Sequence, residues 1–357
     1  MTAHRFPTLH YVEAVLPRGF HRIGLDVKVI TSDLVAPASR KFIGKTRFYG
    51  PDGEDFEVIR LACLDMGNLA LPNPLKLKGL VRSLEPDALF CMAPTKGLPF
   101  YPFLWDGPPI FTQIGEHMPV RGVKKSLKKW AYTRMVERSA AVFITKIESQ
   151  DFLNGLLGRQ VETHPVFLPF DEEIFYWDPE ERERTRRELG VEGPLIVSAS
   201  MITPHKKYEA LVDAVAQLRA TLLLVGLLKT DAYASKLASY AREKLGSRFI
   251  SMPFLPQERL RPIFNAGDVG VWTWTSVAVK QALGTGLPVV MWKPRHLIEE
   301  GVQGYYFEER ETGYIKSALS KALDRSWDRE ELYRIGVSKY SSVAIAKLIH
   351  GLMKQKL

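Results

Sequence analysis

The sequence predicts an α/β protein with two doubly wound domains, and three features carry that prediction. Short apolar segments alternate with amphipathic segments along the whole chain. The apolar segments are near-continuous rather than alternating, as in strands buried on both faces of a parallel sheet. Strands and helices follow one another in turn in each half, as doubly wound folds require. The length of 357 residues is sufficient for two domains of ordinary size.

Ten segments are expected to form strands, five in each half. Those of the first half are 26–31, 57–63, 87–92, 110–115 and 141–146. Those of the second half are 194–200, 221–226, 248–254, 269–274 and 288–292. Helices are expected between them, because apolar residues recur there at helical spacing; the clearest are 208–219, 231–246 and 312–324.

The boundary between the two domains is expected near 170–190. Two prolines and the charge run "DPEERERTRRE" follow an apolar segment near Val166 there, and such a run predicts a solvated helix or a linker. We therefore assign 1–170 to the first domain, 171–338 to the second, and 339–357 to a C-terminal helix.

Composition excludes some classes of protein and favours others. No run of eighteen apolar residues is present, and the first residues lack the order of a secretion signal. Cys63 and Cys91 lie in apolar segments, which predicts reduced core residues and a cytoplasmic protein. The net charge of +9 favours an anionic partner, such as nucleotide phosphates, an anionic membrane surface or nucleic acid.

Several segments of the second half, taken in order, resemble the motifs of one enzyme family. "FLPFDEEIFYWDP" is similar to its interdomain segment, and "IVSASMITPHKKYEALVDAVAQL" to its strand, basic loop and helix. "QALGTGLPVV" is similar to E-A-M-A-x-G-x-P-V-V, and "IEEGVQGYYFEE" to V-x-x-G-x-x-G. These motifs belong to the retaining glycosyltransferases of family 4, also described as group 1 glycosyl transferases. The resemblance covers roughly residues 165 to 345.

The resemblance implies the GT-B fold, with two facing Rossmann-like domains and a cleft between them. The first domain would lie on the acceptor side, the second would bind the donor, and the last helix would cross back to the first. The implied reaction moves a sugar from a UDP-sugar or GDP-sugar to a glycan, a lipid-linked molecule or another hydroxyl acceptor. It would retain the anomeric configuration and need neither a metal ion nor another cofactor.

The basic loop supplies the first candidate site residues. The resemblance places Lys206 at the lysine that contacts the donor diphosphate, with Lys207 beside it, and places Met201 where the family has an arginine. Cationic side chains suit this position because they neutralise the charge of a leaving diphosphate. The alternative is that 205–207 only opens a surface helix.

The turn "KQALGTG" supplies further candidates. The resemblance places Gln281 at a carboxylate that binds the nucleotide ribose, and Thr273 at a second carboxylate, eight residues earlier, that contacts the donor sugar. No Asp or Glu occurs from 269 to 298, so the family's E-x7-E motif is degenerate here. An amide still hydrogen-bonds a hydroxyl, but without the strength of a charged acceptor. Thr275 and Ser276 are candidates to cap the next helix or to hold a phosphate at its N-terminus.

Three aromatic side chains complete the candidate site. His117 follows a first-half strand, where the resemblance places a histidine that faces the donor sugar; a structural histidine is the alternative. Trp272 and Trp274 are expected to share one face of a strand, either stacking on a base or sugar or packing in the core.

The segment 121–139 predicts a basic helix. Its apolar residues are expected to line one face: Val123, Leu127, Trp130, Ala131 and Met135. Its first turns carry Arg121, Lys124, Lys125, Lys128 and Lys129. Such a helix can lie on an anionic membrane, follow a nucleic-acid backbone, or be a domain helix with a solvated basic face.

Two other functions compete with glycosyl transfer. The carboxylate pair, the arginine and the Gly-Gly turn of the family are not found, which favours a catalytically inactive GT-B binding subunit or scaffold. The positive charge alone supports a glycosyltransferase that modifies nucleic acid. A nucleotide-sugar epimerase has less support, because its acid and base carboxylates are not evident.

Overall fold

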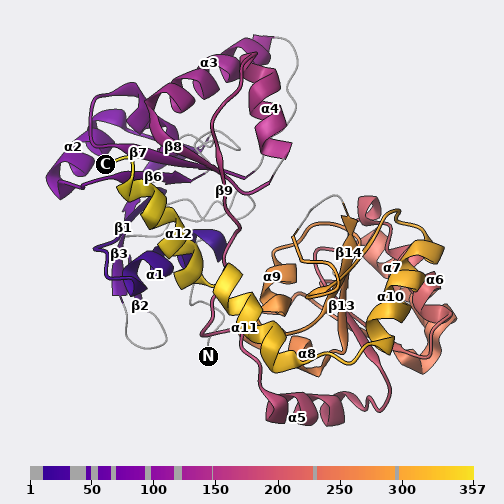
Figure 1. Cartoon of the computed structure of the whole chain (residues 1–357). Helices are drawn as coiled ribbons and strands as arrows, with labels where there is room; N and C mark the ends of the chain where they lie inside the picture. The colour runs from indigo at the N-terminus through magenta and orange to yellow at the C-terminus, as the bar shows by residue number, and fades with distance from the viewer. Residues whose placement is uncertain are drawn as a thin grey trace. The chain divides into compact units, whose positions relative to one another are not determined.

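The protein is described by a computed structural model that covers 11–32, 46–49, 55–65, 70–92, 98–115, 123–146, 148–227, 231–293 and 297–357. The chain divides into two compact units. Unit 1 comprises Met1–Pro169 and Ser342–Leu357, and unit 2 comprises Phe170–Ser341. Each unit combines helices with a parallel sheet (Figure 1). Within the described ranges, no helix is long and apolar enough to cross a membrane.

Unit 1 contains a four-stranded parallel sheet in the order β6-β7-β8-β9, a three-stranded sheet in the order β1-β3-β2, and the antiparallel pair β4-β5. Its described elements are α1 (Tyr11–Arg22), β1 (Lys28–Ser32), β2 (Thr46–Tyr49), β3 (Asp55–Leu61), β4 (Cys63–Asp65), β5 (Ala70–Pro72), α2 (Pro74–Leu84), β6 (Leu89–Met92), the 3₁₀ helix η2 (Leu98–Leu104), β7 (Ile110–Ile114), α3 (Val123–Arg138), β8 (Ser139–Ile144), α4 (Glu148–Leu157), β9 (His164–Pro165) and α12 (Ser342–Lys354).

The first and last helices of unit 1 pack closely together. Leu16 and Phe20 of α1 share a buried cluster with Ile345 and Ile349 of α12. A Cβ atom on Gly19 would lie 2.3 Å from the carbonyl oxygen of Ser342, so only glycine allows this approach. Packing of α1 thus places the C-terminal helix in the core of unit 1.

Both cysteines are buried in unit 1, and they do not form a disulfide. Cys63 lies in β4 and Cys91 in β6. Burial raises the pKa of the Cys91 thiol to about 12, so this side chain stays protonated and behaves as a small apolar group.

Unit 2 is built on a six-stranded parallel sheet in the order β12-β11-β10-β13-β14-β15. Its described elements are α5 (Pro179–Leu189), β10 (Leu195–Ala199), the 3₁₀ helix η3 (Pro204–Lys206), α6 (Tyr208–Ala216), β11 (Thr221–Val225), α7 (Ala232–Leu245), the 3₁₀ helix η4 (Gly246–Arg248), β12 (Phe249–Met252), α8 (Gln257–Ala266), β13 (Val269–Trp272), α9 (Ala278–Leu283), β14 (Val289–Trp292), β15 (Gly304–Phe307), α10 (Thr312–Asp324) and α11 (Arg329–Tyr340).

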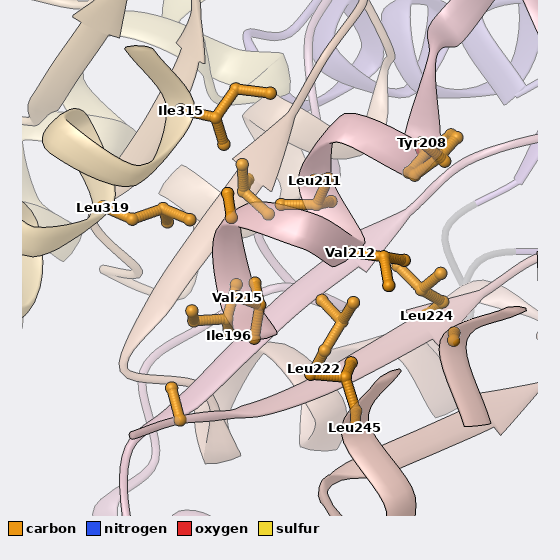
Figure 2. Packing of buried hydrophobic residues seen from close by; sticks show 14 of the residues in the cluster. Ile196, Tyr208, Leu211, Val212, Val215, Leu222, Leu224, Leu245, Ile315 and Leu319 are labelled. Atoms are coloured by element: carbon orange, nitrogen blue, oxygen red, sulfur yellow. The ribbon is translucent and has the colours of Figure 1, made fainter. Parts of the chain in front are cut away.

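Helices cover both faces of this sheet, with α6, α7 and α10 on one side and α8 and α9 on the other (Figure 1). Figure 2 shows the core on the first side, where Leu211 and Val215 of α6 lie among Ile196, Leu222 and Ile315 from β10, β11 and α10. Burial on both faces explains why the strand segments are almost entirely apolar.

The chain enters and leaves unit 2 at neighbouring positions. The backbone N–H of Phe170 donates to the carbonyl oxygen of Tyr340 at 2.9 Å, and Phe170 forms a parallel bridge with Ser341. The first and last residues of unit 2 are therefore held together by backbone hydrogen bonding.

The predicted α/β architecture is confirmed; the differences are the ends of some elements and several short strands that were not predicted. The predicted helix 312–324 is α10 to the residue, whereas the predicted strand 269–274 ends at Trp272. β12 stops at Met252, because Pro253 has no N–H for a sheet ladder. The edge strand β15, with the sequence "GYYF", was not predicted, because it lacks a continuous apolar run.

The charge run forms helix α5, so the helix prediction is correct and the linker alternative is wrong. Asp178 caps its first turn by accepting from Glu181 N–H at 2.9 Å, and Gly190 ends it in a left-handed conformation. One face of α5 is not solvated. Glu181 is only 2% exposed and accepts two hydrogen bonds from Arg261, at 2.9 and 2.8 Å.

Two arginines of α5 bind the carboxylate of Asp268 and the C-terminal carbonyl groups of α8. Arg182 donates to Asp268 Oδ1 at 2.5 Å and Arg186 to Asp268 Oδ2 at 3.0 Å. Both also donate to the carbonyl oxygen of Ala266, at 3.0 Å each. Cations are stabilising there, because a helix C-terminus carries partial negative charge.

Asp268 also joins the first residues of two strands. Its Oδ2 accepts from the backbone N–H of Leu195 at 2.7 Å, and its own N–H donates to the Leu195 carbonyl at 2.8 Å. Burial alone would raise the pKa of Asp268, but the Leu195 N–H and the Arg182 and Arg186 guanidinium groups together lower it. Asp268 is therefore an ionised link between α5, β10 and β13.

We predict that Asp268→Asn destabilises unit 2 by about 3 kcal/mol at pH 7, because it leaves two partly buried guanidinium groups without a carboxylate. Because the pKa of Asp268 is lowered by folding, the stabilisation is present above the unfolded value of about 4 and is lost as pH falls through the folded value. Urea unfolding followed by tryptophan fluorescence measures the effect. Five of the seven tryptophans are in unit 2.

The matched control is Asp106→Asn, because Asp106 pairs with Arg138 at 3.2 Å but its side chain is fully exposed. We expect this control to change stability by less than about 1 kcal/mol. Two results would contradict the role of Asp268 as an ionised link. One is an equal loss of stability in the two variants, and the other is a loss of stability in Asp268→Asn that stays the same well below pH 4.

Candidate functional site

The topology of unit 2 indicates that a ligand would bind at the carboxyl ends of β10 and β13. The chain runs from β10 outward to β11 and β12, then returns to place β13 on the other side of β10. Ligands of open α/β sheets bind at such a switch point, outside the carboxyl ends of the strands. The indole N–H of Trp272, at the end of β13, donates to the carbonyl oxygen of Ala199, at the end of β10, at 3.0 Å. This hydrogen bond holds the two strand ends together.

Lys206 lies in the loop that follows β10 and is only 8% exposed. Its ammonium donates to Ser200 Oγ at 3.1 Å and to the Met201 carbonyl oxygen at 2.7 Å. The hydroxyl groups of Tyr208 and Ser200 lie 2.5 Å apart and share a hydrogen bond. The Lys206 ammonium is therefore held in place by the first residues after β10.

The charge of Lys206 is not balanced by a carboxylate of the described chain. Burial lowers the pKa of its ammonium, and no described Asp or Glu forms an ion pair with it. A lysine has three N–H donors, and two of them are used within the loop. A buried cation without a counterion is costly, so an anion that reaches the third donor would be bound favourably.

Lys207 adopts a left-handed backbone conformation, with φ 52° and ψ 51°. It ends η3 and precedes α6, and its side chain is exposed. The family 4 motif that this loop resembles, G-R-L-x-x-x-K-G, has glycine directly after the lysine, and glycine suits a left-handed residue. The structure therefore gives Lys207 a turn-forming role, and its contact with a diphosphate stays a prediction.

Thr273 follows β13 directly and is completely buried. Its Oγ1 has no hydrogen-bond partner within the described structure, and the same is true of Thr203 Oγ1 in the loop before Lys206. Buried hydroxyl groups without partners are uncommon, because each costs free energy. Thus two unsatisfied hydroxyl groups and one unpaired cation follow the adjacent strands β10 and β13.

Gln281 lies in α9, the short helix after β13, and is 5% exposed. Ser276 Oγ accepts from the N–H of Ala278 at 3.3 Å, but the N-cap residue of α9 is Val277, which makes no side-chain capping bond, so the predicted N-cap position of Ser276 is one residue too early. Thr275 precedes it and is half-buried. Contact of Gln281, Thr275 and Ser276 with a nucleotide stays a prediction.

The glycines of the turn after Gln281 are required by packing. A Cβ atom on Gly284 would lie 2.5 Å from the Phe170 ring. Gly286 has a φ of +66°, and a Cβ there would lie 2.1 Å from the carbonyl oxygen of Arg329. These glycines therefore serve the approach of Phe170 and α11, and their presence does not by itself indicate a ligand.

Trp272, the last residue of β13, and Trp274, two residues later, have different neighbours. Trp272 is fully buried and packs against Phe264 of α8, which confirms a core role. Trp272 and Trp274 were predicted to share one face of a strand. That prediction is wrong, because β13 ends at Trp272 and Trp274 lies beyond it. Trp274 stacks on Trp292 with ring centroids 5.1 Å apart, and the Arg310 guanidinium lies 4.8 Å from its centroid.

One exposed aromatic side chain at this edge was not predicted. Phe254 follows β12 and is 62% exposed, and Met201, after β10, is 58% exposed. The two flank the carboxyl end of β11 in the sheet order. An aromatic residue between two prolines, in "PFLP", was the sequence signal, because such a segment cannot continue a strand.

His117 lies outside the described residues, so the structure does not place it. Within the described ranges, no group of three or more His, Cys, Asp and Glu side chains forms a candidate metal site.

Comparison with known proteins agrees with this geometry. Residues 193–325, which lie in unit 2, match the family model described as glycosyl transferases group 1. No curated protein sequence matches the chain. Anabaena HepE in complex with UDP is a similar solved structure, with 20% identity and a TM-score of 0.67 over 84% of this chain and 86% of that chain.

A second similar structure is sucrose-phosphate synthase from Thermosynechococcus elongatus. It has 16% identity and a TM-score of 0.70 over 95% of this chain and 91% of that chain. The chain has the GT-B fold. The predicted fold class is therefore confirmed, and both GT-B units are built on parallel sheets.

We predict that Lys207→Gly stabilises unit 2 by about 0.5–1 kcal/mol, because glycine adopts the left-handed conformation without the steric cost that an L side chain meets. Thermal unfolding of unit 2, followed by tryptophan fluorescence, measures the change. Lys207→Ala is the matched control, because it removes the same charge but keeps the Cβ atom. If both variants stabilised unit 2 by the same amount, the gain would come from removal of the lysine charge and not from relief of backbone strain.

Proposed function

We propose that this protein is a glycosyltransferase that moves a sugar from a nucleoside diphosphate sugar to a hydroxyl acceptor. The observation that carries the proposal is the buried ammonium of Lys206, without a described carboxylate partner, at the switch point of the unit 2 sheet. A diphosphate is the anion that this site suits, because charge builds on it as the bond to the sugar breaks. The match of 193–325 to group 1 glycosyl transferases supports the same reaction.

The other residues of the site take the remaining parts of the donor in this proposal. Thr273 is completely buried, so its hydroxyl group reaches the donor sugar or the diphosphate only if donor binding uncovers it; that contact would then satisfy its unpartnered oxygen. The Gln281 amide binds ribose hydroxyls, and the exposed ring of Phe254 stacks on the base. We favour a UDP-sugar, because HepE of the same fold is described in complexes with UDP and with UDP-glucose.

The course of the reaction follows from the resemblance to family 4. We propose that the anomeric configuration is retained, that no metal ion takes part, and that His117 faces the donor sugar. The chain's own cation, Lys206, then stabilises the leaving diphosphate in place of a divalent ion. The acceptor is a glycan, a lipid-linked molecule or another polar molecule with a free hydroxyl group.

One observation favours a different function, a binding subunit without catalysis. No carboxylate occurs between 269 and 298, and Gln281 stands where the family's ribose-binding carboxylate is expected. A protein of this kind would bind a nucleotide but would not release sugar from any nucleotide sugar. Turnover by the purified chain, measured as release of the nucleoside diphosphate, separates the two functions.

Calorimetric titration with UDP, GDP and ADP, without added metal, tests the donor site. We expect one nucleotide to bind, and Lys206→Gln to weaken its binding about 10- to 100-fold, because a hydrogen bond to a charged phosphate is lost. Lys321→Gln is the control, since Lys321 is exposed in the last turn of α10, at the end of the helix away from the carboxyl ends of the strands. Undiminished nucleotide binding by the folded Lys206 variant would refute the assigned role.

We also predict that Gln281→Glu tightens binding of the nucleoside diphosphate several-fold, because a carboxylate accepts a charge-assisted hydrogen bond from a ribose hydroxyl. The same titration measures the effect, with Gln217→Glu as a control on the far end of α6. If affinity stays unchanged or falls in the Gln281 variant, this side chain does not face the ribose.

A further inference from the structure

Unit 1 exposes three large apolar side chains on two neighbouring elements. Leu127 and Trp130 of α3 are 66% and 52% exposed, and Leu104 at the end of η2 is 44% exposed. We call these three residues, together with the exposed Lys129, the α3 surface. Large exposed apolar side chains on two elements that pack together indicate an interaction site.

The α3 surface belongs to a fixed part of unit 1. The Trp130 ring packs edge-on against Phe100 of η2, with centroids 5.8 Å apart. Arg134 Nε donates to the Phe103 carbonyl oxygen at 3.0 Å, which ties α3 to η2. Tyr132 and Met135 are each 1% exposed and occupy the core. The helix therefore has a buried apolar side and a separate exposed apolar side.

This arrangement corrects one prediction from the sequence. Leu127, Trp130 and Met135 were expected to line a single face of the helix. In the structure, Met135 packs in the core with Tyr132, whereas Leu127 and Trp130 remain exposed. The helix thus carries more apolar surface than its own domain covers.

Helix α3, which carries most of the α3 surface, is strongly basic. Helix α3 contains six Lys and Arg residues and one acidic residue, Glu137. The exposed Lys129 forms no ion pair with a described residue. The ammonium of Lys128 lies 4.8 Å from the centre of the Phe152 ring, so its stem runs along the domain surface. A partner of this surface therefore combines negative charge with an apolar interior.

We propose that the α3 surface docks unit 1 onto an anionic lipid bilayer. Leucine and tryptophan enter the boundary between headgroups and acyl chains, while lysines stay at the level of the anionic headgroups. The two exposed leucines distinguish this partner from nucleic acid, which offers stacking faces and phosphates but no hydrocarbon. The proposal concerns unit 1 alone and stands whether or not the donor site of unit 2 is active.

Sedimentation with lipid vesicles tests the proposal on the full chain. We expect binding to vesicles of phosphatidylcholine with phosphatidylglycerol, and much weaker binding to phosphatidylcholine alone. Leu127→Asp should reduce binding about tenfold or more, because it removes an inserted side chain and adds repulsion. Leu75→Asp is the matched control: Leu75 lies on α2 of the same unit, is 79% exposed, and its variant has the same charge.

A second pair of variants tests the electrostatic part. Lys129→Gln should weaken vesicle binding several-fold, whereas Lys236→Gln on unit 2 should leave it unchanged. Equal losses for Leu127→Asp and Leu75→Asp, or no binding of the wild-type chain to anionic vesicles, would overturn the proposal. It would also be overturned if duplex DNA bound in preference to vesicles and Leu127→Asp left both unaffected.

Discussion

The contact between Asp268 and Leu195 is the constraint on which the site of unit 2 depends. It joins β13 to β10 at their amino ends through two hydrogen bonds, while Arg182 and Arg186 of α5 hold the same carboxylate. The Trp272 indole joins the same two strands at their carboxyl ends. Because Thr273 directly follows β13 and Lys206 lies in the loop after β10, the position of the site is a consequence of this pairing.

Sequence patterns predicted the parts of the fold that local rules control. Helical spacing gave the limits of α10, and continuous apolar runs gave the central strands of unit 2. The ends of β12 and β13 were placed too late, because strand pairing rather than hydropathy decides where a ladder stops. The charge run of α5 was expected to be solvated, because its partners on α8 and Asp268 lie about 80 residues away in the chain.

For the candidate site, the sequence predicted which residues take part but not their burial or backbone conformation. The motif located Lys206, but only the structure shows that it is buried and that no described carboxylate balances it. The left-handed conformation of Lys207 was not predicted, since lysine gives no signal of positive φ. Helical periodicity identified α3 as partly apolar, but it cannot tell which apolar side packs inward. That distinction depends on η2 and β8, which meet α3 only in the folded unit.

The adjacent ends of unit 2 have a consequence for its stability. The chain passes into unit 2 at Phe170 and returns at Ser341, and these residues are bridged. While unit 1 stays folded, its own residues Pro169 and Ser342 hold both ends of the 172-residue segment. An unfolded unit 2 is then a closed loop with less conformational entropy than a free chain. Unit 1 therefore acts on unit 2 as a covalent cross-link would, by restricting the denatured ensemble rather than by adding native contacts.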